Sequence, residues 1–516
     1  MNEKVIFWKD EEAAHPEWSE LLPGRPWHFD AVNLEESRRM IWLETFDWRL
    51  WQRGLVLFCC GDFFLLYDLE RWCEVSRQFC SDGKRIRFAA ELPEGDCRTR
   101  VESAAGGRAL LRLVALSRRD RSFSGAMAAA EPQLRLDLSL LRLHGIHKSR
   151  RSGMALLYLR RLSHDEVPGD NFEHFLSRHG FQTVSAPVDI LIHLLRLIGR
   201  RPLDYSMKIT TELTPDLPVG TAVMRLLHDN FRLIHVNETG IRADIDREFL
   251  HDYRVAFRRS RTLLTAFGFC FQAAPLAEMR TKFRHWANAT NCLRDCDVLL
   301  ESRDRYLALL PPELHPGLLL FFRRIATIRH GELLTLREAL SGDKYHDFCC
   351  RWRELLLDSR LLLRPDPGLP IAVAAGMEIY RCYRKVVRGG RKLDADTGDV
   401  ALHRVRIQCK KLRYLLEFFS GIFPPAVRKR VASLKKLQDT LGAYNDMAVQ
   451  IATLQSKIDD PDCRLRPAAV AAVGGLIAVL ATDKKRLRHE FRTGFEAFAS
   501  ERNVAFFRKY FRSEPP

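Results

Sequence analysis

A cluster of histidine and basic residues occurs twice in this chain with the same internal spacing, and no other feature constrains the fold as strongly. The first copy begins at His251 and the second at His403, so a shift of 152 residues (403 − 251) superimposes them. Because an α-helix turns by about 100° per residue, offsets 0, 3, 7 and 10 lie within about 80° of one another. Each copy therefore predicts a helix with a histidine and three cations on one face, which suits an anionic ligand. The pairs that coincide are His251 with His403, Arg254 with Arg406, Arg258 with Lys410, Arg259 with Lys411, and Arg261 with Arg413.

A second pair of matching segments supports an internal duplication. Asp295 lies 44 residues after His251 (295 − 251), and Asp446 lies 43 residues after His403 (446 − 403). Agreement in two motifs and in their separation is hard to obtain by chance. The pattern predicts two similar helical bundles, one over residues 217–365 and the other over residues 366–516.

Length and charge predict two domains with different roles. A chain of 516 residues exceeds what one hydrophobic core usually organises. The segment Thr214 to Gly220 has two prolines and a glycine before a long helical pattern, so we expect the domain boundary there. Residues 1–240 contain 33 Lys and Arg against 33 Asp and Glu, whereas residues 241–516 contain 49 against 32. The excess of +17 lies in the second part, which indicates a polyanion-binding half attached to a neutral one.

The first half has a β-like texture, and the chain has the features of a cytoplasmic protein. Short apolar runs at residues 55–60, 63–67, 86–88 and 156–159 are typical of strands. No signal-peptide pattern opens the chain, and the most apolar stretch, residues 467–481, is too short for a membrane span and predicts a buried helix. The 13 cysteines form no CxxC pair, which favours reduced thiols over a zinc site or disulfides.

The motifs of the second half resemble the CHAD family, the conserved-histidine α-helical domains. The resemblance covers roughly residues 217–516. It implies an all-α duplicated helical bundle that binds inorganic polyphosphate in a basic central cavity, performs no chemistry and is associated with polyphosphate granules. The matching segments are His251 to Arg261, Leu293 to Leu299, His403 to Tyr414, and Lys435 to Asp446.

The residue chemistry agrees with such a ligand. The planar fork of arginine donates two parallel hydrogen bonds to phosphate oxygens, and lysine supplies a point charge. A protonated histidine could also donate to phosphate, although either histidine could instead be a packing residue with a satisfied ring nitrogen. We expect Asp295, Asp297, Asp439 and Asp446 to orient the arginines by salt bridges rather than bind a metal, and we expect no cofactor. The predicted polyphosphate-binding residues are His251, Arg254, Arg258, Arg259, Arg261, His403, Arg406, Lys410, Lys411 and Arg413.

The first half resembles a CYTH domain, the triphosphate-tunnel fold often fused upstream of CHAD, through the segment Glu44 to Leu57. The resemblance implies an α+β two-domain chain in which residues 1–210 form an antiparallel β-barrel with flanking helices. The catalytic Glu-x-Glu-x-Lys signature of that family does not occur before Asp47, and Phe58, Cys59 and Cys60 stand where the family places arginine. We therefore expect a degenerate and inactive CYTH-like domain.

Three functions remain to be weighed. The first is a non-enzymatic polyphosphate-binding protein in the cytoplasm, at polyphosphate granules and without a membrane contact. The second is a metal-dependent triphosphatase in the first half, motivated by Asp47 and by Glu35, Glu36 and Glu44. The third is a nucleic-acid-binding protein, for which the motif faces offer few stacking groups besides Tyr253, Phe257 and Tyr414. The sequence indicates no oligomeric state.

Overall fold

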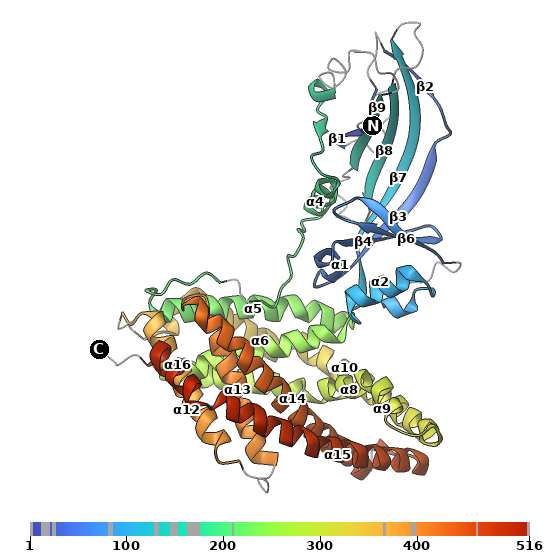
Figure 1. Cartoon of the computed structure of the whole chain (residues 1–516). Coiled ribbons are helices and arrows are strands. Elements are labelled where there is room, and N and C mark those ends of the chain that lie inside the picture. Colours follow the sequence, from blue (N-terminus) through green and yellow to red (C-terminus); the bar gives the residue numbers. More distant parts are fainter. Residues whose placement is uncertain are drawn as a thin grey trace. The chain divides into compact units, whose positions relative to one another are not determined.

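The chain folds into two compact units, Met1–Ser206 and Met207–Pro516. The computed structural model describes residues 4–11, 21–22, 27–80, 86–127, 134–144, 153–161, 176–208, 211–364, 368–393, 399–460 and 463–512. The first unit is an antiparallel sheet with a few helices, and the second is helical (Figure 1). This architecture confirms the prediction of an antiparallel sheet followed by an all-α region.

The sheet of the first unit is organised around one long strand, β7 (Leu110–Met127). On one side β7 pairs with β3 (Glu36–Thr45) and then with β2 (Trp27–Ala31), and on the other side with β8 (Leu134–His144). In β8 alternate leucines are buried in a core that contains Phe123 and Phe181. The other strands are β1 (Lys4–Glu11), β4 (Leu55–Cys60), β5 (Phe63–Asp68), β6 (Cys73–Phe79), β9 (Gly153–Arg161) and β10 (Gln182–Thr183), and the helices are α1 (Arg49–Gln52), α2 (Asp96–Ala105) and α4 (Pro187–Leu197).

The prediction of a β-barrel is wrong in one respect, because the sheet is not closed. Its strand order is β10-β1-β9-β8-β7-β3-β4-β5-β6, and within the described ranges the two end strands do not pair with each other. A barrel closes only when both edges pair along their length. The edge strand β10 has two residues, both exposed, so it offers little backbone for such pairing. Residues 86–88, expected as a strand, contribute only an isolated bridge between Phe88 and Ala109.

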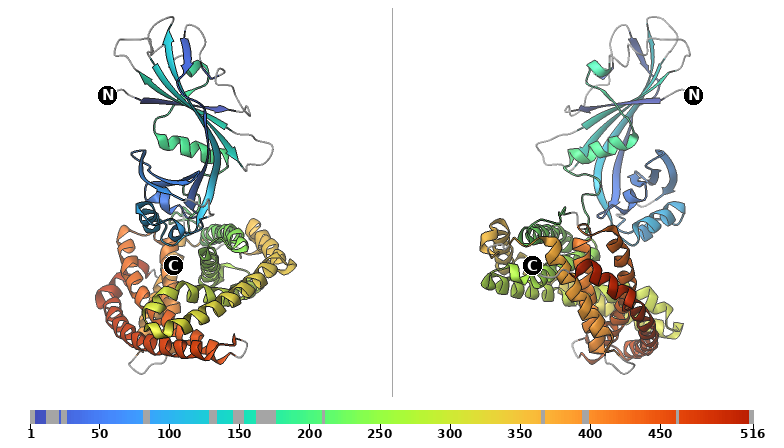
Figure 2. Two further views of the ribbon diagram at one scale, coloured as in Figure 1. Left: turned by 90° about the vertical axis from the view of Figure 1, so that its right-hand side faces the viewer. Right: turned by 60° about the vertical axis from the view of Figure 1, so that its left-hand side comes forward.

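The helical unit contains pairs of helices that lie side by side (Figure 2). The closest pairs are α5 with α6, α12 with α13, and α14 with α15. Helix α6 begins after Asp246, whose carboxylate accepts the backbone N–H of Glu248 and so caps the helix. The bounds are α5 (Val219–Ala243), α6 (Arg247–Ala266), α7 (Ala273–Ala289), α8 (Asn291–Glu301), α9 (Arg303–Ala308), α10 (His315–Ser341), α11 (Asp343–Leu357), α12 (Ile371–Gly390), α13 (Asp399–Phe419), α14 (Pro425–Asp459), α15 (Pro467–Phe498) and α16 (Glu501–Phe511).

The apolar stretch at residues 467–481 forms the first half of α15. Among the helices that the structure describes, only α15 is long enough and apolar enough to cross a membrane, judged by length and composition alone. Its Ala472, Val473 and Leu476 are buried in a core that also contains Phe321 and Phe322 of α10. The predicted helix is confirmed, but it is not a buried one: one face packs in the core, and 28% of its apolar window is buried. That the helical unit consists of two equivalent bundles remains a prediction.

Candidate anion-binding cavity

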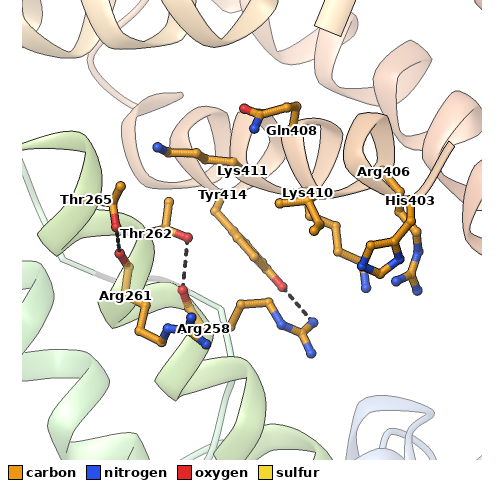
Figure 3. A pocket seen from close by; sticks show the side chains of 11 residues that line it. Arg258, Arg261, Thr262, Thr265, His403, Arg406, Gln408, Lys410, Lys411 and Tyr414 are labelled. Atoms are coloured by element: carbon orange, nitrogen blue, oxygen red, sulfur yellow. Dashed lines mark hydrogen bonds between the residues drawn. The ribbon is translucent and has the colours of Figure 1, made fainter. Parts of the chain in front are cut away.

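A cavity of about 490 Å³ lies between α6 and α13, the two helices that carry the repeated motif (Figure 3). Six of the ten predicted binding residues line it. The other four, namely His251, Arg254, Arg259 and Arg413, are not among its lining residues. The cavity is lined by Arg258, Arg261, Thr262 and Thr265 of α6 and by His403, Arg406, Ile407, Gln408, Lys410, Lys411 and Tyr414 of α13.

Helical periodicity explains why these side chains converge. On α13 most lining residues recur every three or four positions, from His403 to Tyr414, and therefore share one face. The opposite face carries buried apolar residues such as Leu412 and Leu416, which fix the rotation of the helix about its axis. On α6 the lining residues Arg258 to Thr265 follow the same spacing. The prediction that each motif occupies one helical face therefore explains how the cavity wall is built.

Two of the predicted cations pair with Glu417 of α13 instead of lining the cavity: Arg259 reaches it from α6, and Arg413 lies one turn before it on the same helix. Arg259 is buried and contacts a carboxylate oxygen of Glu417 at 3.6 Å, and Arg413 contacts the other oxygen at 3.2 Å. Arg259 also donates to the backbone oxygen of Met207 at 2.7 Å. The Glu417 carboxylate thus bridges α6 and α13. This bridge could not be predicted from the sequence, because it depends on the packing of two distant helices.

Helix α14 holds α13 through three consecutive residues. Tyr444 donates to Asp399, Asn445 contacts Nδ1 of His403 at 2.6 Å through its amide oxygen, and Asp446 accepts from Arg406 at 2.6 Å. These contacts explain why the segment with Asn445 and Asp446 follows His403 at a distance of about 43 residues. Asn445 was part of the matching segment, but its role as the partner of the histidine became visible only in the structure.

The first copy of the motif is arranged differently. Arg254 donates to the backbone oxygen of Ala287 at 3.2 Å and to the hydroxyl of Thr290, so it joins α6 to the end of α7. The shift that matches Asp446 with Asp295 (446 − 295 = 151) places Arg294 opposite Asn445. The amide oxygen that holds His403 therefore has no counterpart at that position. The two copies of the motif therefore differ at this position.

The four predicted orienting aspartates have separate roles. Asp446 pairs with the cavity residue Arg406. Burial raises the pKa of Asp295 above its usual value, and the positive charge of the nearby Arg254 opposes this effect only in part. Asp297 is fully buried and contacts Arg329 of α10 at 2.6 Å, so it belongs to a network away from the motif arginines. Asp439 is exposed.

The electrostatics of the cavity favour a bound anion. Burial, with the charges of Arg258 and Arg406, lowers the pKa of Lys410 to about 7. Burial also lowers the pKa of Arg406, and the charge of Arg258 adds to this effect. The pKa of Arg261 is lowered by burial in the same way. Such shifts mean that each charge is poorly solvated and repelled by its neighbours. An anion in the cavity would relieve both penalties at once.

The cations of the cavity are also poorly neutralised. Among the side chains that the structure describes, no carboxylate lies within ion-pair distance of Arg258, Arg261, Lys410 or Lys411. Within the same set, Nε of Arg406 is a buried donor without an acceptor. Buried donors normally have a partner, so these groups are available to a ligand.

Two groups of side chains place potential metal ligands within 4.8 Å of one another, counting only the described residues. One is His235, Glu238 and Cys349, and the other is Glu248, His251 and Asp252. Burial raises the pKa of Cys349 to about 12, so its thiol is protonated near neutrality. Neither group includes a residue of the cavity wall.

Comparisons with known proteins identify the helical region. Residues 225–455 match the family model for the CHAD domain. Two uncharacterized proteins, from two strains of Mycobacterium tuberculosis, are each 26% identical over 243 residues. That match covers 44% of this chain and 46% of the relative, so the chain spans about half the length of the curated relatives it matches.

Two solved structures are also similar. The crystal structure of the CHAD domain from the plant Ricinus communis has 24% identity and a TM-score of 0.48, and the match covers 56% of this chain and 95% of that one. PptA from Streptomyces chartreusis has 17% identity and a TM-score of 0.42, with 54% and 98% covered. The region matched by the family model contains every residue that lines the cavity. This region of the chain, residues 225–455, is a CHAD domain.

Proposed function

We propose that this protein binds inorganic polyphosphate in the cavity between α6 and α13 without performing chemistry on it. The observation that carries the proposal is the group of cations on the cavity wall without a neutralising carboxylate. Lys410 is the clearest member, since its pKa is lowered to about 7 by burial and by the arginines around it. Charges held in this way are costly in the free protein and become favourable when an anion enters.

The chemistry of the wall favours a phosphate chain over a nucleic acid. Polyphosphate carries repeated negative charge and no apolar groups, so it needs cations and no stacking platforms. Single-strand binders usually interleave aromatic rings with the basic groove. Of the described lining residues only His403 and Tyr414 carry aromatic rings, and the Tyr414 hydroxyl accepts a hydrogen bond from Arg258 at 3.3 Å.

A competition experiment tests the identity of the ligand. The full chain is incubated with labelled long-chain polyphosphate and challenged with unlabelled polyphosphate or with single-stranded RNA of equal total charge. We expect polyphosphate to displace the label at a concentration about ten-fold lower than RNA. Equal displacement, or stronger displacement by RNA, would contradict the proposal and favour a nucleic-acid-binding function.

For the first unit we keep the proposal of a degenerate CYTH-like domain, with which the antiparallel sheet is compatible. The carboxylates that motivated a triphosphatase are engaged elsewhere. Glu44 accepts backbone N–H groups of Leu50 and Trp51 at 3.0 and 2.9 Å, and Asp47 pairs with Arg49 and Arg108. We expect no phosphate release from tripolyphosphate by the full chain with Mg²⁺ or Mn²⁺, and turnover would contradict this proposal.

The proposed location is the cytoplasm, at polyphosphate granules. It follows from the proposed ligand, because granules hold the polymer at high local concentration. A fluorescent fusion of the full chain should concentrate on granules in cells that form them. A fusion that stays diffuse in such cells would contradict this part of the proposal.

A further inference from the structure

Lys410 differs from Lys411, the other lysine of the cavity, in what surrounds its amine. Arg258 approaches it from α6, Arg406 and Arg413 lie on its own helix, and Asp446 is the nearby acid from α14. Figure 3 shows Lys410 on the α13 wall between Tyr414 and Arg406. Lys411, the next residue, is affected instead by Cys382, Arg381 and Glu378. The amine of Lys410 therefore stands within a group of guanidinium donors.

In the free cavity, these surroundings favour the neutral, nucleophilic form of the amine near neutral pH. Only the neutral form of an amine has a lone pair for attack. With a pKa of about 7, about half of the Lys410 amines are neutral at that pH. An unperturbed lysine, with a pKa near 10.4, has a neutral fraction smaller by a factor on the order of a thousand. The guanidinium groups add a second property, since they bind phosphate groups.

From this combination we propose that Lys410 is a site of acylation by small acyl phosphates, whose phosphate group is held by Arg258 and Arg406. The proposal rests on the proposed function to the extent that both require these cations to bind phosphate. The cavity, at about 490 Å³, has room for such a molecule. Holding the phosphate would bring the neighbouring acyl carbon close to the amine, which converts a slow bimolecular reaction into a local one.

The reaction is balanced without a further reactant. The Lys410 nitrogen attacks the acyl carbon, and a C–N bond forms. The bond between that carbon and the phosphate oxygen breaks, and phosphate leaves with the electron pair. The amine loses one proton to the leaving phosphate or to water, so the products are an amide and hydrogen phosphate.

Acylation would change the binding of the polymer. The amide has no charge, so the cavity loses one cation. The repulsion of Lys410 with Arg258 and with Arg406 also disappears. A phosphate chain already in the cavity would in turn cover the amine. We therefore expect acylation of Lys410 and polyphosphate binding to exclude each other.

The test uses acetyl phosphate as the probe and the full chain as the target, with peptide mass spectrometry to follow each lysine. Lys485 of α15, which is exposed, is the internal reference. We expect Lys410 to be acetylated at least about ten-fold faster than Lys485, and tripolyphosphate to slow the reaction at Lys410 but not at Lys485. A rate at Lys410 no greater than that at Lys485 would overturn the proposal.

A second reagent separates phosphate recognition from simple amine reactivity. Arg258→Gln should reduce acetylation of Lys410 by acetyl phosphate more than acetylation by acetic anhydride, which has no phosphate to hold. Equal reduction with both reagents would overturn the role of Arg258 in holding the phosphate. Lys410→Arg keeps a cation in the cavity, removes the reactive amine and should abolish labelling at this position.

The outcome is distinguishable from failure of the proposed function. The same preparation is titrated with long-chain polyphosphate. Normal polyphosphate binding with unselective acetylation of Lys410 would overturn this inference alone. Selective acetylation without polyphosphate binding would overturn the proposed function and leave a cavity specific for small phosphates.

Discussion

At the residue scale, Lys410 links the electrostatics of the free cavity to its ligand. Its pKa is lowered by burial and then by Arg258 and Arg406. A polyanion that fills the cavity would reverse this shift, so binding would take up a proton and the affinity would depend on pH. The same residue therefore reports on stability in the free protein and on binding in the complex.

We predict that the affinity for polyphosphate falls as the pH rises from about 6 to about 9, because Lys410 loses its charge over this range in the free protein. Loss of one charge-assisted contact of about 1.5 kcal/mol corresponds to roughly ten-fold in affinity. Calorimetric titration at the two pH values measures the change. In Lys410→Arg the dependence should be clearly shallower, and an equally steep dependence in that variant would assign it to other groups.

Substitution of Lys410 by a neutral side chain should have opposite effects on stability and binding. A lysine with a lowered folded-state pKa destabilises the fold at low pH, and this penalty disappears as the pH rises through about 7 toward the unfolded value. We predict that Lys410→Met raises the free energy of unfolding near neutral pH by about 1 kcal/mol and weakens polyphosphate binding. Denaturant unfolding measures the first effect, and a destabilised variant would contradict it.

In the first unit, Glu44 provides an independent pH-dependent prediction. Burial raises the pKa of Glu44 to about 7, although backbone hydrogen bonds from Thr45, Trp51 and Leu50 lower it in part. For an acid with a raised folded-state pKa, the fold loses stability as the pH rises from about 4.5 through about 7. The loss approaches about 3 kcal/mol above that range. Tryptophan fluorescence of thermal unfolding should show this dependence, and Glu44→Gln should remove it.

At the element scale, the crossing of α10 and α15 depends on one glycine. A Cβ on Gly317 would lie 2.1 Å from the backbone oxygen of Ala468, so the two helices approach at a distance that only glycine permits. Because the obstructing atom belongs to the backbone, it cannot move aside like the end of a side chain. Packing of the core that contains Phe321 and Leu476 follows from this approach.

We therefore predict that Gly317→Ala lowers the free energy of unfolding by about 2–3 kcal/mol. The matched control is Gly331→Ala on the same helix, where a Cβ would meet no atom within 4 Å. There the substitution should stabilise the helix by about 0.5–1 kcal/mol, as expected for glycine in a helix interior. Similar effects from both substitutions would contradict the close crossing.

The elements also show what the sequence could predict. The binding face of α13 follows from helical spacing alone, so Arg406 and Lys410 could be placed together without a structure. The bridge from Arg259 to Arg413 through Glu417 could not, because it depends on the relative placement of helices far apart in the sequence. The difference between His251 and His403 has a sequence signal, the presence of Asn445 at one position and Arg294 at the matching one.

The open sheet has a related explanation. Short apolar runs predict strands such as β4 and β9, but they do not specify whether the two edges of the sheet meet. Closure depends on edge strands, and β10 with its two residues is too short for sequence alternation to reveal. The expected CYTH-like barrel therefore came from family resemblance, and the structure shows an antiparallel sheet that is compatible with it but is not closed.

At the scale of the whole molecule, the excess positive charge and the cavity lie in the same part of the sequence. The excess of +17 falls in the part of the sequence after residue 240, and the cavity lies in the CHAD domain. Long-range attraction by this charge would speed the encounter with any polyanion and weaken with added salt. Under the proposed function, specific recognition comes from the cavity, and the basic side chains outside it contribute long-range attraction.

The most direct test of the polyphosphate-receptor account is titration of the full chain with long-chain polyphosphate at several salt concentrations. Wild type is compared with Arg258→Gln/Arg406→Gln and with a charge-matched control, Arg303→Gln/Arg360→Gln, whose arginines are exposed and lie outside the cavity. The account predicts that the cavity variant binds at least about 30-fold more weakly and with a shallower salt dependence, while the control changes less than about three-fold. Equal losses in the two variants would contradict it, since binding would then follow total charge and not the cavity.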